Sequence, residues 1–83
     1  MVNCFYQIVL FDVDKPSEPS QAMIEMVTDK RWRILKDDVI ETICMGSDIY
    51  RIVGRRSFFK ESALFGNTYY LIMDIKKEII NYE

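Results

Sequence analysis

Two segments of the sequence are apolar at almost every position, and they constrain the fold more than any other feature. Residues 4–13 read CFYQIVLFDV, and residues 68–75 read TYYLIMDI. Successive side chains of a strand point to opposite faces, so these patterns predict strands that are apolar on both faces. Such a strand must be central in its sheet or lie at an interface. We expect the first segment to be central.

The chain after the first apolar segment predicts a loop followed by a helix. Residues 14–20 read DKPSEPS, in which two prolines and two serines favour a loop. Ser20, or alternatively Ser17, can cap a helix, because a serine oxygen accepts a hydrogen bond from a free amide of the first turn. Apolar residues then recur at helical spacing, and a helix is predicted over residues 20–29.

The middle of the chain predicts short strands, with alternatives left open. Residues 31–35 and 39–45 alternate apolar and polar side chains and are interpreted as two strands joined by a charged turn. The same stretch, residues 31–45, could instead form one helix. Residues 49–54 predict the next strand. Residues 57–66 are either a short helix or part of a hairpin.

This order of elements predicts a small α+β domain. Residues 1–83 are expected to form a single domain, because a chain of this length supports one modest hydrophobic core. The sheet is expected to be mainly antiparallel, with four to five strands and one or two helices packed on one face. A ferredoxin-like arrangement is one way to close such a sheet, and a meandering sheet on a single helix is the alternative.

Asp12 and Asp14 follow the first apolar segment and are the candidate catalytic pair. An apolar strand that ends in Asp-x-Asp resembles the first motif of haloacid dehalogenase-type phosphotransferases, and this resemblance implies a nucleophilic Asp12 and an acid–base Asp14. That motif continues with small residues whose amides reach the phosphate. Here Lys15 and Pro16 follow, and proline lacks the amide hydrogen. We therefore interpret both aspartates as residues that end a strand and begin a loop.

Other residues that carry catalysis are scarce, so the protein is predicted not to be an enzyme. The sequence has no histidine, the commonest acid–base group and metal ligand near neutral pH. Cys4 and Cys44 form neither a disulfide framework nor a zinc motif and are interpreted as reduced, buried thiols. No cofactor and no metal site are predicted. No apolar run reaches the roughly 18 residues that span a bilayer, and no signal peptide is recognised, so we expect a cytoplasmic protein with no membrane contact.

Charge is distributed unevenly along the chain. Residues 1–29 carry one basic and five acidic residues, a net charge of −4, and residues 61–83 carry two basic and four acidic residues, a net charge of −2. Residues 30–60 carry eight basic and four acidic residues, a net charge of +4. Aromatic residues are interspersed with these arginines, a composition typical of protein-binding hot spots and of single-stranded nucleic acid sites.

The predicted partner-binding site lies in this basic segment. Gly54 is expected to end a strand, so that Arg55 and Arg56 lie at a strand exit with no acidic residue within three positions. Phe58 and Phe59 should point to opposite faces, one in the core and one exposed. The full set of partner-binding candidates is Arg55, Arg56, Phe58, Lys60, Arg33 and Arg51.

These features predict a small non-enzymatic regulator or inhibitor that docks on a larger protein, of the kind found among antitoxins, immunity proteins and phage-encoded inhibitors. Apolar residues make up 49% of this short chain, which agrees with a partner that covers some of them. The alternative is a nucleic-acid-binding regulator that uses residues 30–60, which the overall acidic balance disfavours. A homodimer is a further prediction, with residues 68–75 as an unpaired apolar edge that a second copy would join.

Overall fold

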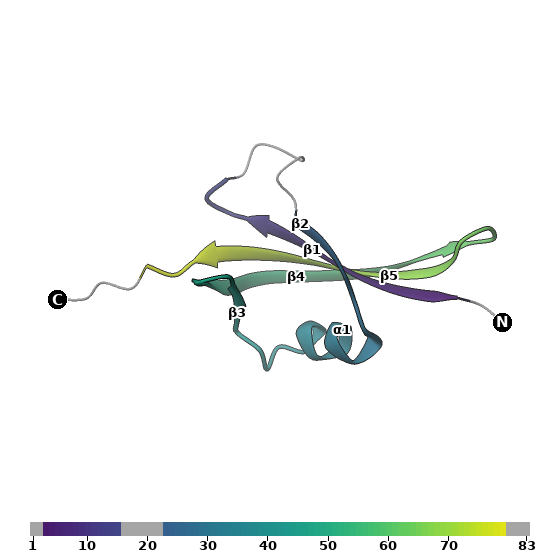
Figure 1. Cartoon of the computed structure of the whole chain (residues 1–83), viewed down its shortest axis with the longest axis horizontal. Coiled ribbons are helices and arrows are strands. Elements are labelled where there is room, and N and C mark those ends of the chain that lie inside the picture. Colours follow the sequence, from purple (N-terminus) through teal and green to yellow (C-terminus); the bar gives the residue numbers. More distant parts are fainter. Residues whose placement is uncertain (1–2, 16–22, 80–83) are drawn as a thin grey trace.

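The computed structural model describes residues 3–15 and 23–79, which form five strands and one helix (Figure 1). In chain order the elements are β1 (Cys4–Asp12), β2 (Met23–Val27), α1 (Asp29–Lys36), β3 (Thr42–Met45), β4 (Asp48–Ser62) and β5 (Gly66–Lys77). The predicted α+β class is therefore confirmed for the described residues. The second helix that the sequence left open is not found among the described residues.

All five strands form one sheet, in the order β2-β1-β5-β4-β3. β1 and β5 run parallel, while the other three neighbouring pairs are antiparallel, so the prediction of a mainly antiparallel sheet is confirmed. A register shift between Ile52 and Gly54 interrupts the pairing of β4 with β5. Bulges of this kind bend a strand, and the β3 end of the sheet turns toward the side on which α1 lies (Figure 1). The ferredoxin-like arrangement is not confirmed, because the described elements run β-β-α-β-β-β with a single helix.

The two apolar segments occupy the middle of the sheet. β5 is the central strand, and β1 lies next to it. Leu71, Met73 and Ile75 are fully buried on one face of β5. The expectation that residues 4–13 form a central strand is confirmed in that β1 is an inner strand, paired on both sides. The prediction that residues 68–75 form an unpaired edge for a homodimer is wrong, because β1 pairs with one side of β5 and β4 pairs with the other.

Two local assignments from the sequence are reversed in the structure. Met23–Val27 is a strand, not the end of a helix, and the proposed caps Ser17 and Ser20 lie outside the described residues. The helix lies one segment later, in Asp29–Lys36, where a strand was predicted and a single helix over residues 31–45 was left as the alternative. Neither prediction is right in full, because the helix ends at Lys36 and residues 42–45 form β3. The hydroxyl oxygen of Thr28 accepts a hydrogen bond from the Arg31 amide at 3.2 Å, which caps the first turn.

The single helix covers one face of the sheet and completes the core. Its two buried residues, Trp32 and Leu35, are three positions apart and so point to the same side. The Trp32 ring lies 5.8 Å from the ring of Tyr6 and 5.7 Å from the ring of Tyr69. Loss of hydration in this cluster, reinforced by the carboxylate of Asp29, raises the pKa of Tyr6. The buried core consists of Ile8, Leu10, Trp32, Leu35, Ile43, Ile52, Leu71, Met73 and Ile75.

The segment that the sequence left open, residues 57–66, belongs to a hairpin. β4 continues without a break to Ser62, and a short turn leads to Gly66 at the start of β5. Gly66 has a φ of +92°, a backbone conformation that favours glycine. Gly54 was predicted to end a strand. It lies instead within β4, beside the bulge.

We expect Gly66→Ala to reduce the free energy of unfolding by about 2–3 kcal/mol. A methyl group there would meet the backbone oxygen of Asn3 at 2.3 Å, in addition to the positive φ. Gly46, in the β3–β4 turn, has a φ of +62° but open space around it, so Gly46→Ala should cost only about 1 kcal/mol. Urea unfolding of both variants measures the difference. Equal losses would contradict the close approach of Asn3 to the hairpin.

Candidate functional site

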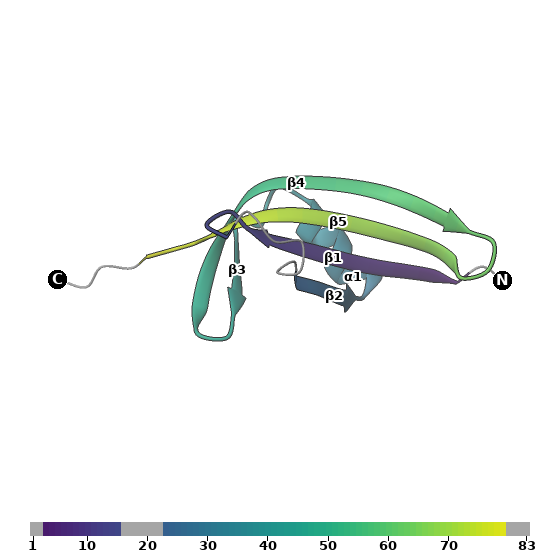
Figure 2. The ribbon, with the colours of Figure 1, turned by 90° about the horizontal axis from the view of Figure 1, so that it is seen from above.

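The face of the sheet that points away from α1 is not covered by any element that the structure describes. We call this surface the open face. Figure 2 looks onto it, with α1 behind the strands. On β4 and β5 it carries every second residue. The alternate residues of β5, among them Leu71, Met73 and Ile75, are buried in the core on the other face, where β4 contributes Ile52. A strand that is apolar on both faces thus has one face buried in the core and the other turned to solvent.

Strand pairing aligns the open face into rows that run across four strands. One row joins Ile24, Val9, Ile72 and Arg56, and the next joins Met26, Gln7, Tyr70 and Phe58. A third row, across three strands, joins Phe5, Thr68 and Lys60. The rows are therefore mostly apolar toward β2 and β1. On β4 two of them end in a basic side chain, Arg56 or Lys60, and the row between them ends in Phe58.

Several large apolar side chains on this face are left in contact with solvent. Ile24 is 66% exposed, Met26 is 54% exposed, Phe58 is 49% exposed and Phe5 is 36% exposed. A single exposed apolar residue needs no explanation, but a contiguous apolar patch on one face of a small protein marks an interaction surface. The open face is therefore the strongest candidate site that the described residues offer.

Three of the predicted partner-binding residues come together on this face. Arg56, Phe58 and Lys60 occupy alternate positions of β4 and point to the same side. The Phe58 ring stacks on the Tyr70 ring of the neighbouring strand, with 4.8 Å between the ring centres. Neither Arg56 nor Lys60 makes an ion pair with any described residue. Their charges are therefore available to a partner.

Arg55 is not part of this group, which corrects the prediction of a free arginine at a strand exit. Its guanidinium lies on the helix side of the sheet and donates hydrogen bonds to the backbone oxygens of Leu35 and Ile40. It also pairs with the carboxylate of Asp38 at 3.3 Å, and only 16% of the side chain is exposed. Arg55 thus connects β4 to the end of α1 and to the loop that follows it. Its partners are 15 to 20 residues away in sequence, so the lack of acidic residues within three positions of Arg55 does not reveal them.

Arg33 and Arg51 also lie apart from the open-face group. Arg33 is on α1 and pairs with Asp29 one helical turn earlier, with 2.5 Å between Nε and Oδ1. The hydrogen bond and the negative charge of Asp29 raise the pKa of Arg33. Arg51 pairs with Glu78 at 2.8 Å, near the end of β5. Both arginines are exposed, but each already has an acidic partner.

Phe58 and Phe59 point to opposite faces, as the sequence predicted. Phe58 stacks on Tyr70, whereas Phe59 packs against Tyr69 on the helix side, with 5.0 Å between the ring centres. The expectation that one of the two lies in the core is wrong, because each is 49% exposed. Phe58 and Phe59 are therefore equally exposed to solvent, one on each face of β4.

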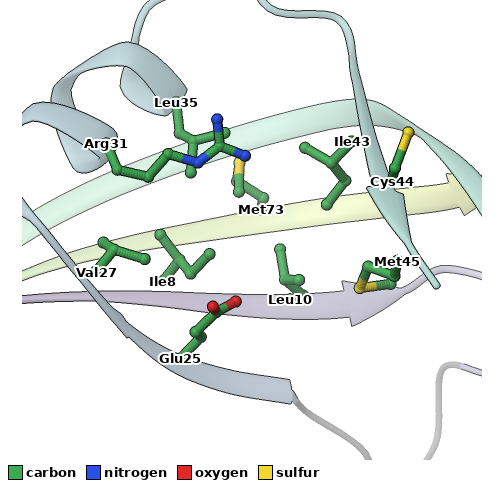
Figure 3. A pocket seen from close by; sticks show the side chains of 10 residues that line it. All are labelled: Ile8, Leu10, Glu25, Val27, Arg31, Leu35, Ile43, Cys44, Met45 and Met73. Carbon is green, nitrogen blue, oxygen red and sulfur yellow. The ribbon is translucent and has the colours of Figure 1, made fainter.

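A concave surface lies on the helix side of the sheet, between β2, α1 and β3 (Figure 3). It is a cleft of about 220 Å³ whose floor is apolar, with Leu10, Leu35 and Met73 among its lining residues. Glu25 and Arg31 approach its mouth from opposite sides. No ion pair joins these two side chains.

Asp12, Asp14, Cys4 and Cys44 do not gather into a common site in the structure. The carboxylate of Asp12 accepts a hydrogen bond from the amide of Asp14 at 2.9 Å, so it stabilises the turn after β1. Cys4 and Cys44 are free and exposed, which corrects the prediction that they are buried.

No group of three His, Cys, Asp or Glu residues that could hold a metal ion is found in residues 3–15 and 23–79. Within the same ranges, no helix is long and apolar enough to cross a membrane.

Sequence reasoning found the basic end of the open face but missed its apolar part. The residues absent from the predicted partner-binding set are Phe5, Val9, Ile24, Met26, Tyr70 and Ile72, although residues 68–75 were predicted to contact a second copy of the chain. The available signal was the two-sided apolar pattern of residues 4–13 and 68–75, which requires either burial on both faces or an interface.

Comparisons with models of protein families, with curated proteins and with solved structures found no match.

Proposed function

We propose that this protein is a non-enzymatic cytoplasmic regulator or inhibitor that docks on a larger protein through the open face of its sheet. The observation that carries this proposal is the contiguous apolar surface of Phe5, Val9, Ile24, Met26, Phe58, Tyr70 and Ile72, which lacks a cover among the described residues. Water-exposed apolar area of this kind gains free energy when a partner covers it.

The composition of this surface also suits protein recognition. Interface hot spots are enriched in aromatic residues and arginine, grouped near the centre of the contact. On the open face, the stacked Phe58 and Tyr70 rings lie beside Arg56 and Lys60. An apolar centre with cations at one side fits a partner surface that is apolar with an acidic margin. Small inhibitors such as antitoxins and immunity proteins act by this kind of docking.

A nucleic-acid-binding regulator remains the second candidate, because aromatic rings beside cations also suit single-stranded nucleic acid. The distribution of charge favours it less. Of the eight basic residues in segment 30–60, Arg33, Arg51 and Arg55 are paired with acidic residues. Arg56 and Lys60 are the members of this segment in the open-face rows, and two cations give little of the electrostatic attraction that backbone phosphates require.

Ile24→Asp is expected to abolish capture of the partner without destabilising the fold. The side chain is 66% exposed at the β2 end of the open face, so a carboxylate there stays hydrated in the free protein but is buried in the complex. We expect binding to weaken by about 2 kcal/mol or more, which is roughly 30-fold. Affinity capture from cells that express the protein, read by mass spectrometry, compares the variant with the wild type.

Val39→Asp is the matched control, because Val39 is 87% exposed in the loop between α1 and β3, away from the open face. It adds the same charge and should retain the partner. A protein that is captured equally by the wild type and both variants would contradict the proposal. Recovery of nucleic acid in place of a protein, lost in Ile24→Asp, would favour the second candidate.

A further inference from the structure

The longest unpaired strand edge in the described part of the sheet borders the open face. β3 pairs with β4 only over Asp48 to Arg51, and one further backbone hydrogen bond joins the Ile52 amide to the Glu41 oxygen. From Val53 to Ser62, the outer side of β4 has no backbone partner among residues 3–15 and 23–79. β2 and β3, the two outermost strands, have only 5 and 4 residues. The free part of β4 thus offers much more backbone for pairing than either of them.

The side chains along this edge repeat with the period of a strand. Arg56, Phe58 and Lys60 lie at alternate positions on the open face, which gives the order basic, apolar, basic. A strand that pairs with this edge places its own alternate residues directly opposite these three. Because the order is symmetric, a parallel and an antiparallel strand would meet the same pattern.

A second copy of this chain fits the edge poorly. In a two-fold symmetric antiparallel pair centred on Phe58, Arg56 of each copy would lie opposite Lys60 of the other. Like charges directly opposite each other destabilise a strand pair, and edge cations are a common protection against self-pairing. The same two cations attract a strand that carries acidic residues at the matching positions.

We infer that β4 accepts an extended acidic segment of the partner protein as an added strand. The segment has the pattern acidic–x–apolar–x–acidic, with its acidic side chains opposite Arg56 and Lys60 and its apolar side chain against Phe58. This inference rests on the proposed function, since it assigns the contact chemistry of the same partner. The added strand would extend the sheet from five strands to six and would continue the open face outward.

A labelled synthetic peptide tests the inference on the full chain. The probe is fluorescein-labelled Thr-Asp-Thr-Leu-Thr-Asp-Thr, and its control is the same peptide with lysine in place of both aspartates. Fluorescence anisotropy at physiological salt should show binding of the acidic probe and at least tenfold weaker binding of the basic one. Lys60→Glu should weaken the acidic probe about tenfold and strengthen the basic probe by a similar factor, because it reverses one cross-strand charge pair.

Two controls separate edge pairing from other modes of binding. Lys30→Glu on α1 makes the same change in net charge away from the edge and should leave both affinities unchanged. Two further probes carry N-methyl groups on one or the other alternate set of amides. One of them should lose binding, because a strand directs every second amide toward its partner.

The inference is overturned if the acidic probe does not bind, or if Lys60→Glu and Lys30→Glu have the same effect. It is also overturned if both N-methylated probes bind as well as the parent, because the peptide would then lie on the open face without pairing. None of these outcomes bears on partner capture by the wild type and its loss in Ile24→Asp. Failure of the edge inference and failure of the proposed function are therefore distinguishable.

Discussion

Arg55→Glu is expected to destabilise the fold by about 3–5 kcal/mol, whereas Arg56→Glu should leave the free energy of unfolding almost unchanged. The two arginines are neighbours in sequence but lie on opposite faces of β4. The Arg55 side chain is largely buried and donates to two backbone oxygens and a carboxylate. A glutamate there would set a negative charge against three acceptors and leave both carbonyl groups without their donor.

Arg56 has no such role, because its side chain is exposed on the open face and makes no ion pair with a described residue. Urea unfolding of the two variants measures the contrast, and Arg55→Lys adds a useful third point. A lysine keeps the charge but cannot reach three acceptors at once, so an intermediate loss is expected. If Arg55→Glu were as stable as Arg56→Glu, the attachment of α1 to β4 through Arg55 would be wrong.

Trp32→Ala is expected to have an equally large effect, a loss of about 3–5 kcal/mol. Trp32 is 4% exposed and lies against the rings of Tyr6 and Tyr69, which come from the two central strands. The helix has only one other buried residue, Leu35, so truncation of Trp32 removes about half of its anchorage. A domain of this length has a total stability of only about 4–12 kcal/mol, so the variant should be close to unfolding.

Ile34→Ala provides the control for this prediction, because Ile34 is on the same helix but is exposed. It should cost less than about 1 kcal/mol. Denaturant titration followed by circular dichroism measures both variants. A Trp32→Ala protein with the midpoint of the wild type would show that the helix does not hold the aromatic cluster in place.

The apolar pattern on both faces correctly predicted that residues 4–13 form an inner strand, whereas residues 68–75, with the same pattern, were wrongly predicted to be an edge. Residues 4–13 and 68–75 are apolar at positions that point both ways, and β1 and β5 are adjacent inner strands. The short elements were less predictable. In Met23–Val27 the apolar residues fit a helix as well as a strand, and pairing with Tyr6 to Leu10 of β1 decides for the strand.

The candidate site was predicted in part for a similar reason. The alternate positions of Arg56, Phe58 and Lys60 can be read from the sequence once a strand is assigned there, and they share one face. The role of Arg55 could not be read in this way, because it depends on the approach of α1 and the following loop to β4. The bulge between Ile52 and Gly54 was also missed, since a glycine in an apolar segment fits a strand end equally well.

The central claim is that a protein partner covers the open face, and Phe58 and Phe59 allow the most direct test of it. They are adjacent in sequence, equally exposed and on opposite faces of β4. A benzoylphenylalanine photo-cross-linker is introduced in place of one or the other in cells that express the protein, and cross-linked products are compared after irradiation. We predict a cross-linked protein from position 58 and a much weaker product or none from position 59. Equal products from both positions, or a product from position 59 alone, would contradict the claim.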